Sequence, residues 1–260
     1  MIVAGIDSGL YSTKVVLLEQ GRILAEAVVP AGMETADRAA ERGLEVAFQK
    51  AGSSRADLRY TVVTGRGKSF ISFVDEAAPD FMCLAQGMYR ILPSVHSALD
   101  VGAEKSLAVR CSRGRVLNMA SNDKCASGTG TYLQMVSNIL GVPLEGMGQL
   151  SLSSTEKVEV DNTCAVFAES EIISLVHSKK KPQDILRGVY QGLALRLHPL
   201  LVQVGLEREV ALVGGVALDI GVRRAMAQLL GYEVLVPNNP LTVGALGAAM
   251  IAEAKVERTA

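Results

Sequence analysis

The pattern that decides the fold reads Ala4-Gly5-Ile6-Asp7-Ser8-Gly9, and it recurs as Ser97-Ala98-Leu99-Asp100-Val101-Gly102 at an offset of 93 positions. The same offset carries Gly21-Arg22 onto Gly114-Arg115. Each copy reads as an apolar strand, an Asp-x-Gly turn, a second apolar strand, a Gly-Arg turn and a third strand. Two copies of one hairpin unit predict two duplicated domains, beginning near residue 1 and near residue 95.

Helical periodicity fills much of the remaining chain. It predicts helices over residues 36–51, 131–140, 166–176, 184–204, 217–230 and 244–256, with Pro199 kinking or dividing the fourth. Strands are expected at 59–63 and 210–213. Alternating strands and helices predict an α/β protein. We expect residues 1–94 to form the first domain, with the helix at 244–256 packing back on it, and residues 95–243 to form the second.

Composition disfavours several classes of protein. Lys and Arg total 26 and Asp and Glu total 27, so the formal net charge of −1 predicts no basic surface for nucleic acid or an anionic membrane. No apolar run approaches the ~20 residues that span a bilayer, and Asp7 comes too early for a signal peptide. The four cysteines include no Cys-x-x-Cys pair, which disfavours a zinc site. We expect a cytoplasmic protein with neither a nucleic-acid nor a membrane partner.

The first candidate site is the hairpin that runs from Asp7 to Lys14. A tight turn at Gly9 exposes backbone N–H groups to a phosphate, and Asp7 is placed to hold Mg²⁺ directly or through water. Hydroxyl donors and a cation follow at Ser12, Thr13 and Lys14. For one such hairpin an ordinary glycine turn is the better interpretation. The recurrence at Asp100 and Gly102, and a glycine pair at Gly214-Gly215 after a strand, favour a nucleotide cleft between two domains.

The second candidate site comprises two cysteine segments, residues 122–130 and 161–171, each of which leads into a predicted helix. Cys125 and Cys164 therefore stand at or just before helix N-termini, where the helix dipole favours a thiolate or an anionic iron–sulfur cluster. A cubane cluster takes four thiolates, which a two-fold homodimer supplies. Composition alone favours two buried thiols, or one reactive cysteine, over this arrangement.

The three glycine motifs resemble the ordered phosphate and adenosine motifs of the actin, sugar-kinase and heat-shock-chaperone ATPase superfamily. The segments Asn122-Asp123-Lys124-Cys125-Ala126-Ser127-Gly128-Thr129-Gly130 and Thr163-Cys164-Ala165-Val166-Phe167-Ala168-Glu169-Ser170-Glu171 resemble hallmarks of the 2-hydroxyacyl-CoA dehydratase activators. That family includes the ATPase subunits of benzoyl-CoA reductase. The resemblance covers essentially the whole chain and implies two ribonuclease-H-like (actin-like ATPase) domains with an interdomain nucleotide cleft for ATP/ADP and Mg²⁺.

The resemblance also implies roles for particular residues. Catalysis would involve Asp7, Asp100 and Glu104, and the nucleotide would contact Gly9, Ser12, Thr13, Lys14, Gly102, Lys105, Gly214 and Gly215. A homodimer would hold one [4Fe–4S] cluster on Cys125 and Cys164 of each subunit. Hydrolysis of ATP would drive an electron, supplied by reduced ferredoxin or flavodoxin, to a dehydratase or reductase that acts on a CoA thioester.

The chain departs from the family pattern at its second phosphate motif, which reads Gly102-Ala103-Glu104-Lys105 where activators usually have Gly-Gly-Gln-Asp. Lys105 is therefore interpreted as a phosphate contact. The departure keeps two alternatives open, an ATPase subunit of a benzoyl-CoA-reductase-like hetero-oligomer and a non-catalytic ATP-sensing module. A third, a cluster-free small-molecule kinase, would explain the phosphate motifs but gives no role to the segments of Cys125 and Cys164. Gly65-Arg66-Gly67-Lys68-Ser69 is not a P-loop, because Val62 stands where the first glycine is needed. We interpret it as a loop, with contact to a phosphate or the partner as a second possibility.

Overall fold

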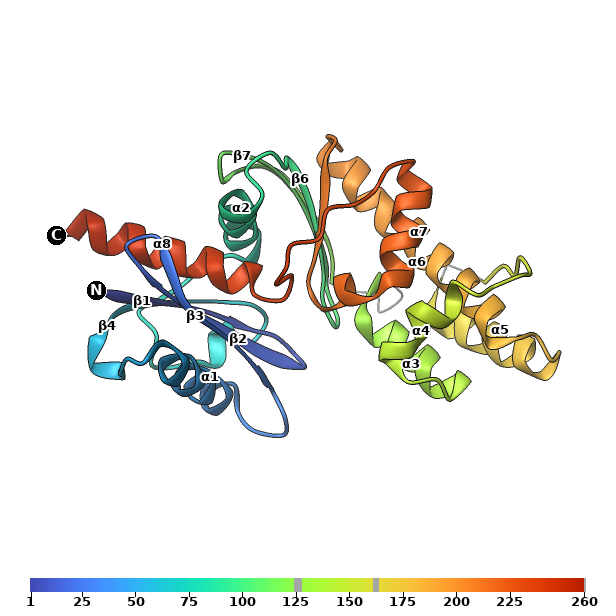
Figure 1. Ribbon diagram of the computed structural model, residues 1–260, viewed down its shortest axis with the longest axis horizontal. Coiled ribbons are helices and arrows are strands. Elements are labelled where there is room, and N and C mark those ends of the chain that lie inside the picture. Colours follow the sequence, from blue (N-terminus) through green and yellow to red (C-terminus); the bar gives the residue numbers. More distant parts are fainter. Residues whose placement is uncertain (124–127, 161–163, 260) are drawn as a thin grey trace. The chain divides into compact units, whose positions relative to one another are not determined.

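The computed structural model describes residues 1–123, 128–160 and 164–259 and confirms a mixed α/β fold with two sheets (Figure 1). The strands are β1 (Ile2–Ser8), β2 (Ser12–Glu19), β3 (Arg22–Pro30), β4 (Leu58–Thr64), β5 (Glu76–Ala77), β6 (Ser97–Val101), β7 (Ser106–Ser112), β8 (Arg115–Asn122) and β9 (Val210–Val213). The helices are α1 (Ala36–Ala51), α2 (Asp80–Ile91), α3 (Gly130–Leu140), α4 (Leu144–Ser151), α5 (Ala165–His177), α6 (Pro182–Val204), α7 (Ile220–Leu230) and α8 (Val243–Thr259).

Packing divides the chain into two compact units. The first comprises 1–98, 109–118 and 237–260, and the second comprises 99–108 and 119–236. The expected division between residues 94 and 95 stays a prediction, and the packing units differ from it at β6, β7 and β8, whose ends fall in different units. Among the described residues, no helix combines the length and apolar character needed to cross a membrane.

The sheet of the first unit has the order β3-β2-β1-β4-β5. The antiparallel meander β1-β2-β3 is the one that the repeat predicts, and β4 joins β1 in parallel. Helix α1 begins at its N-cap Thr35 and ends at Gly52, whose φ of +64° is the left-handed conformation that favours glycine. Its buried face packs on one side of the sheet, against residues such as Val15 and Leu17. Helix α8 covers the other side, as Figure 1 shows.

The contact between α8 and β1 depends on Gly5. A Cβ atom built on Gly5 would stand less than 3.0 Å from the backbones of Ala245 and Ala249, so no larger residue fits there. The two elements are separated by most of the chain, and their close approach places the beginning of α8 beside Asp7: a Cβ built on Gly244 would lie 3.6 Å from Asp7 Oδ2. Helix α2 packs along α8 in the same unit.

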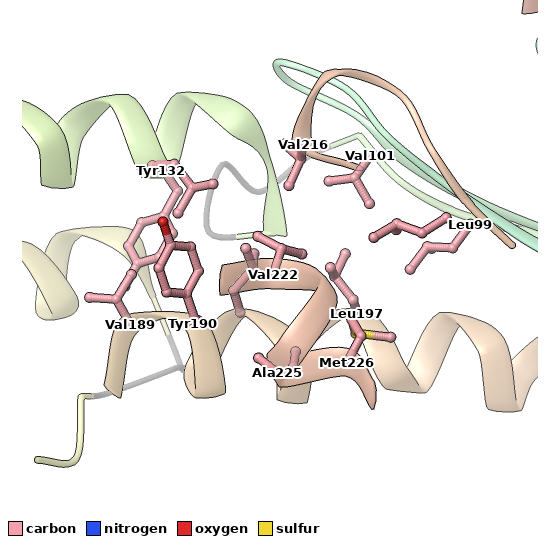
Figure 2. Packing of buried hydrophobic residues seen from close by; sticks show 14 of the residues in the cluster. Leu99, Val101, Tyr132, Val189, Tyr190, Leu197, Val216, Val222, Ala225 and Met226 are labelled. Carbon is pink, nitrogen blue, oxygen red and sulfur yellow. The ribbon is translucent and has the colours of Figure 1, made fainter. Parts of the chain in front are cut away.

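The second unit contains most of the sheet with the order β8-β7-β6-β9. Its core is formed by apolar residues of α3, α4, α6 and α7, which pack against the strands. Figure 2 shows Val101, at the end of β6, and Val216, just after β9, in the same buried cluster as Val222 and Met226 of α7. The core thus anchors both the turn that follows β6 and the turn that follows β9.

Candidate functional site

Asp7 stands near the end of β1 and is flanked on both sides by its neighbours in the sheet. It pairs with Lys14 on β2 and with Thr64 on β4. Asp7 Oδ2 lies 3.6 Å from Lys14 Nζ, and their side chains are 23% and 13% exposed. Lys14 Nζ also donates to the carbonyl of Ser12 at 3.2 Å, and the Gly9 N–H donates to the same carbonyl at 3.1 Å. The structure therefore brings Asp7, Gly9, Ser12 and Lys14 together at one strand end.

Thr13 is not part of this group. Side chains alternate between the faces of a strand, so Thr13 lies on the face of β2 opposite Ser12 and Lys14. Its methyl group lies against Gly43 of α1, and the residue is only 1% exposed. Its Oγ1 has no hydrogen-bond partner among the described residues. Its side chain thus packs between the sheet and α1 rather than beside Asp7.

The second unit repeats the arrangement at Asp100. The turn after β6 closes through a hydrogen bond from the Gly102 N–H to the Lys105 carbonyl at 2.9 Å, and Glu104 lies half-buried within it. The N–H groups of Gly130 and Thr131, in the first turn of α3, donate to the carbonyls of Gly102 and Ala103, both at 2.9 Å. The turn is therefore fixed to the beginning of α3.

Gly214 directly follows β9 and lies against the beginning of the turn that follows β6. Its φ is +85°, and a Cβ built on it would stand less than 3.0 Å from Asp100 Oδ1 and from the carbonyl oxygen of Val101. Gly215 follows, exposed, at the start of a 3₁₀ helix that spans Gly215–Leu218. The structure thus brings Asp100, Gly102 and Gly214 together, as it does Asp7, Gly9 and Lys14 in the first unit.

A pocket of about 530 Å³ lies within the second unit, between α4, α6 and α7. It is lined by apolar and polar side chains, including Leu152, Arg187, Tyr190, Gln191, Ile220 and Arg224. Sequence reasoning missed this pocket, because it depends on three helices that meet only in the folded chain. The one local signal was Asp219, four residues after Gly215, which caps α7 by accepting from the Gly221 N–H at 2.7 Å.

A buried acid–phenol pair forms one wall of the pocket. The Tyr190 hydroxyl donates to Asp219 Oδ2 at 2.6 Å. Burial raises the pKa of the Asp219 carboxyl above its ordinary value, and burial together with the neighbouring Asp219 raises the pKa of Tyr190. Tyr190 therefore remains a proton donor at neutral pH, and the pair joins α6 to the beginning of α7.

The two cysteine segments lead into α3 and α5, which pack against each other. Cys164 is the N-cap of α5 and is half-buried, and its backbone is extended, with φ −149°. The first N–H groups of a helix lack intrahelical partners and favour an anion, so Cys164 fits a cluster ligand. Cys125, the second predicted ligand, lies outside the described residues. Within the ranges that the structure describes, no group of three or more His, Cys, Asp or Glu residues is arranged to hold a metal ion.

The other two cysteines are core thiols. Cys83 and Cys111 are 0% and 1% exposed. Burial raises the pKa of the Cys83 thiol to about 12 and also raises the pKa of Cys111. Both therefore remain protonated at neutral pH, which disfavours metal ligation.

Comparison with known proteins gives concordant results. Residues 4–252 match the BadF/BadG/BcrA/BcrD ATPase family. The chain is 37% identical over 254 residues to the 2-hydroxyisocaproyl-CoA dehydratase activator of Clostridioides difficile, covering 97% of this chain and 95% of that protein. It is 30% identical over 261 residues to one of the benzoyl-CoA reductase subunits of Thauera aromatica, covering 96% of this chain and 92% of that protein.

Two solved structures are similar along nearly their whole length. Component A of the (R)-2-hydroxyglutaryl-CoA dehydratase of Acidaminococcus fermentans has a TM-score of 0.94 and 34% identity, with 99% of each chain covered. The C. difficile dehydratase activator with bound ADPNP has a TM-score of 0.92 and 36% identity, covering 100% of this chain and 97% of that one.

Proposed function

The chain belongs to the BadF/BadG/BcrA/BcrD ATPase family, and we propose that it is an ATP-driven activator of an enzyme that acts on a CoA thioester. It would hydrolyse ATP and pass a low-potential electron from a [4Fe–4S] cluster to a partner dehydratase or reductase. The observation that carries the proposal is the pair of matching aspartate turns, Asp7 and Asp100, in a chain that aligns along its length with dehydratase activators.

The phosphates of ATP are assigned to the two aspartate turns. Lys14, 3.6 Å from Asp7 and mostly buried, supplies a cation in the first turn, and Lys105 supplies one in the second. The N–H groups of Gly9 and Gly102 close the two turns on the carbonyls of Ser12 and Lys105, which holds the backbone of each turn in place. Asp7 and Asp100 hold Mg²⁺ directly or through water, because carboxylate oxygens are hard ligands that suit this ion. Mg²⁺, when bound, neutralises phosphate charge, and Glu104 orients the attacking water.

The base of the nucleotide is assigned to the pocket between α4, α6 and α7. Gly214-Gly215 leads through one 3₁₀ turn to Ile220, which lines that pocket. Its volume of about 530 Å³ is in the range of small-molecule sites, and its lining of apolar, amide and arginine side chains offers stacking surfaces and hydrogen-bond donors to a planar heterocycle. The hydrogen bond between Tyr190 and Asp219 fixes the wall on which the base would rest.

Filling this pocket tests the assignment of the base. Ala225→Leu introduces a larger side chain at a lining position that is 6% exposed, and we expect the Kd for ADP to rise about tenfold by loss of base contacts. Ala227→Leu is the matched control, because Ala227 lies on the same helix at 7% exposure and does not line the pocket. Equal affinities for ADP in the two variants, measured by calorimetry, would contradict the assignment.

The cluster is assigned to Cys125 and Cys164 of each of two subunits. The cluster, when bound, supplies a one-electron carrier, charged by reduced ferredoxin or flavodoxin. The N-cap position of Cys164 supports the assignment, and apolar side chains on α5 support a homodimer. Val166 and Phe167, two and three residues after Cys164, are 65% and 64% exposed and so offer adjacent apolar side chains beside the cluster ligand for a second subunit to cover.

Purification under anaerobic conditions tests the function. We expect a dimer with four iron and four sulfide per two chains and with ATP turnover. Cys164→Ala should lose the iron almost completely and retain the affinity for ADP, because Cys164 lies outside both aspartate turns. Cys83→Ala, the matched control in a buried thiol, should keep both properties. An iron-free wild-type protein would leave the kinase or the ATP-sensing module as the better interpretation, and turnover of ATP would separate those two.

A second candidate function is that of one ATPase component in a hetero-oligomeric reductase. The 30% identity to the benzoyl-CoA reductase protein of T. aromatica and the altered motif at Glu104 and Lys105 favour it. Isolation of the protein from its native cells distinguishes the two. Co-purification with a different, homologous ATPase supports the hetero-oligomer, and a symmetric dimer supports the activator.

A further inference from the structure

The turn from Gly65 to Lys68 is the counterpart, in the first unit, of the glycine turn at Gly214 in the second. Gly65 directly follows β4 and Gly214 directly follows β9, and their φ angles are +87° and +85°. A Cβ built on Gly65 would stand less than 3.0 Å from Asp7 Oδ1 and from the Ser8 carbonyl oxygen, as one on Gly214 would from Asp100 Oδ1 and the next carbonyl. The internal repeat therefore extends to these turns, and each closes on the aspartate of its own unit.

A second glycine brings the first turn still closer to the hairpin. The Gly67 N–H donates to the Ser8 carbonyl at 3.0 Å, and a Cβ on Gly67 would collide with the Ser8 side chain. The turn is therefore in direct contact with Asp7 on one side and with the hairpin backbone on the other. Any displacement of the turn changes the space available to the Asp7 carboxylate.

The far side of the turn is fixed by Asp80, the first residue of α2. Lys68 Nζ lies 3.2 Å from Asp80 Oδ1 and donates to the Ala78 carbonyl at 3.3 Å. Thr64, buried and paired with Asp7 across β1 and β4, donates through Oγ1 to the same two acceptors, at 3.2 Å and 3.1 Å. Asp80 thus holds both ends of the segment that contacts Asp7, at Thr64 and at Lys68.

We propose that Asp80 is a positioning residue of the nucleotide site: by holding Thr64 and Lys68, it sets the Gly65–Lys68 turn against Asp7 and so fixes the direction of that carboxylate toward magnesium nucleotide. This inference rests on the proposed function. A carboxylate must be aligned closely to act on Mg²⁺ and phosphate, and a misplacement of about 1 Å is enough to reduce a rate about 100-fold. The turn itself need not contact the nucleotide.

A contribution to folding stability alone does not explain the ion pair between Lys68 and Asp80. The Lys68 and Asp80 side chains are 33% and 25% exposed, and ion pairs with this much solvent access contribute little to folding. A matched pair exists in the same unit: Lys255 Nζ lies 2.7 Å from Glu76 Oε2, with exposures of 44% and 32%. That pair is the control for loss of a surface ion pair as such.

The test uses the full chain, purified anaerobically, as Asp80→Asn, Asp80→Glu, Lys68→Met and the control Glu76→Gln. We expect Asp80→Asn and Lys68→Met to lower kcat for ATP hydrolysis about 10-fold, with KM changed by less than about two-fold. The Kd for ADP with Mg²⁺ should rise about five-fold, and the Kd for ADP without Mg²⁺ should stay at the wild-type value. Asp80→Glu, which restores the carboxylate, should recover most of kcat, and Glu76→Gln should match the wild type.

Energetic coupling between Asp80 and Lys68, measured from the kcat of the double variant, gives a further test. The double variant Asp80→Asn with Lys68→Met should be no slower than either single variant, because both act through one turn. Wild-type kinetics and Mg²⁺ dependence in Asp80→Asn would overturn the inference, as would a rise in the Kd for Mg²⁺-free ADP in Lys68→Met, which would make Lys68 a direct phosphate ligand. A wild-type chain that neither binds nor hydrolyses ATP would instead overturn the proposed function.

Discussion

The aspartate turns of the two units share their backbone and differ in their side chains. Gly65 and Gly214 have nearly the same φ and approach Asp7 and Asp100 in the same way. After Gly214 the chain continues into Gly215 and then into buried apolar residues, whereas after Gly65 it reaches Lys68, which pairs with Asp80. Backbone sterics thus preserve a duplicated geometry, while the side chains around it are free to take different roles.

The largest expected effect is the loss of ATP hydrolysis when the charge of Asp7 or Asp100 is removed. Asp7→Asn and Asp100→Asn should each lower kcat for ATP hydrolysis about 100- to 1000-fold, because both carboxylates face the phosphates in the proposed site. Because both carboxylates are assigned to Mg²⁺, each variant should also weaken the Mg²⁺ dependence of ADP binding. Steady-state kinetics and calorimetry measure both effects. Retention of more than half of the wild-type turnover by either variant would remove that aspartate from the catalytic group.

Adding a methyl group to each glycine tests whether the two turns are equally constrained. Gly65→Ala and Gly214→Ala should each lower the free energy of unfolding by about 2–4 kcal/mol, because the new Cβ meets a carboxylate and a backbone carbonyl at a positive φ. Thermal and denaturant unfolding provide the measurement. Gly21→Ala is the control, since Gly21 also has a positive φ, +73°, but has open space around its Cβ position. Its cost should be about 1 kcal/mol, and equal costs at all three positions would show that φ alone matters.

The smallest expected effect is a change in the pH dependence of stability. It tests Asp219, whose hydrogen bond with Tyr190 forms one wall of the pocket in the second unit. Burial raises the pKa of Asp219 above its unfolded value, so between those two values the folded protein binds more protons than the unfolded chain. Stability from this group therefore falls as pH rises through that window. Asp219→Asn abolishes the titration, so the stability of this variant relative to the wild type should improve as pH rises through that window.

Asp57 provides the control of opposite sign. Hydrogen bonds from Ser54 lower the pKa of this exposed carboxyl, so its stabilising contribution is present above its unfolded pKa and is lost as pH falls. Asp57→Asn should therefore lose stability relative to the wild type as pH rises through the window just below the unfolded pKa of this carboxyl, whereas the window for Asp219 lies above the unfolded pKa. Denaturant unfolding at several pH values measures both slopes, and parallel slopes for the two variants would contradict the assignment at Asp219.

Local pattern predicted the elements that repeat or have a clear period. The hairpins around Asp7 and Asp100 and the helix at 36–51 are present as predicted. Helices α2 and α4 were not predicted: α2 is apolar on most of its surface and contains Gly87, and α4 contains two glycines. Their stability comes from tertiary contacts, such as those of α2 with α8. The helix at 184–204 was predicted to kink or divide at Pro199, and α6 continues to Val204 without division.

The candidate site was predictable only where its residues are close in sequence. Asp7 and Lys14 were found because one hairpin carries both. The role of Gly65 was hidden because it lies 149 positions from Gly214 rather than 93, since the second unit contains additional helices before β9. Thr13 was grouped with Ser12 and Lys14 from the motif, although strand alternation places its side chain on the opposite face. Asp80 and the pocket at Tyr190 depend on contacts between distant segments.

The close contact between Gly5 and the helix that begins at Val243 has a consequence for biosynthesis. Strand β1 leaves the ribosome long before α8, the helix that covers it. Translation therefore completes the second unit before α8 can cover the sheet of the first unit. Until α8 has emerged, one side of the sheet that contains β1 stays open to solvent and to chaperones.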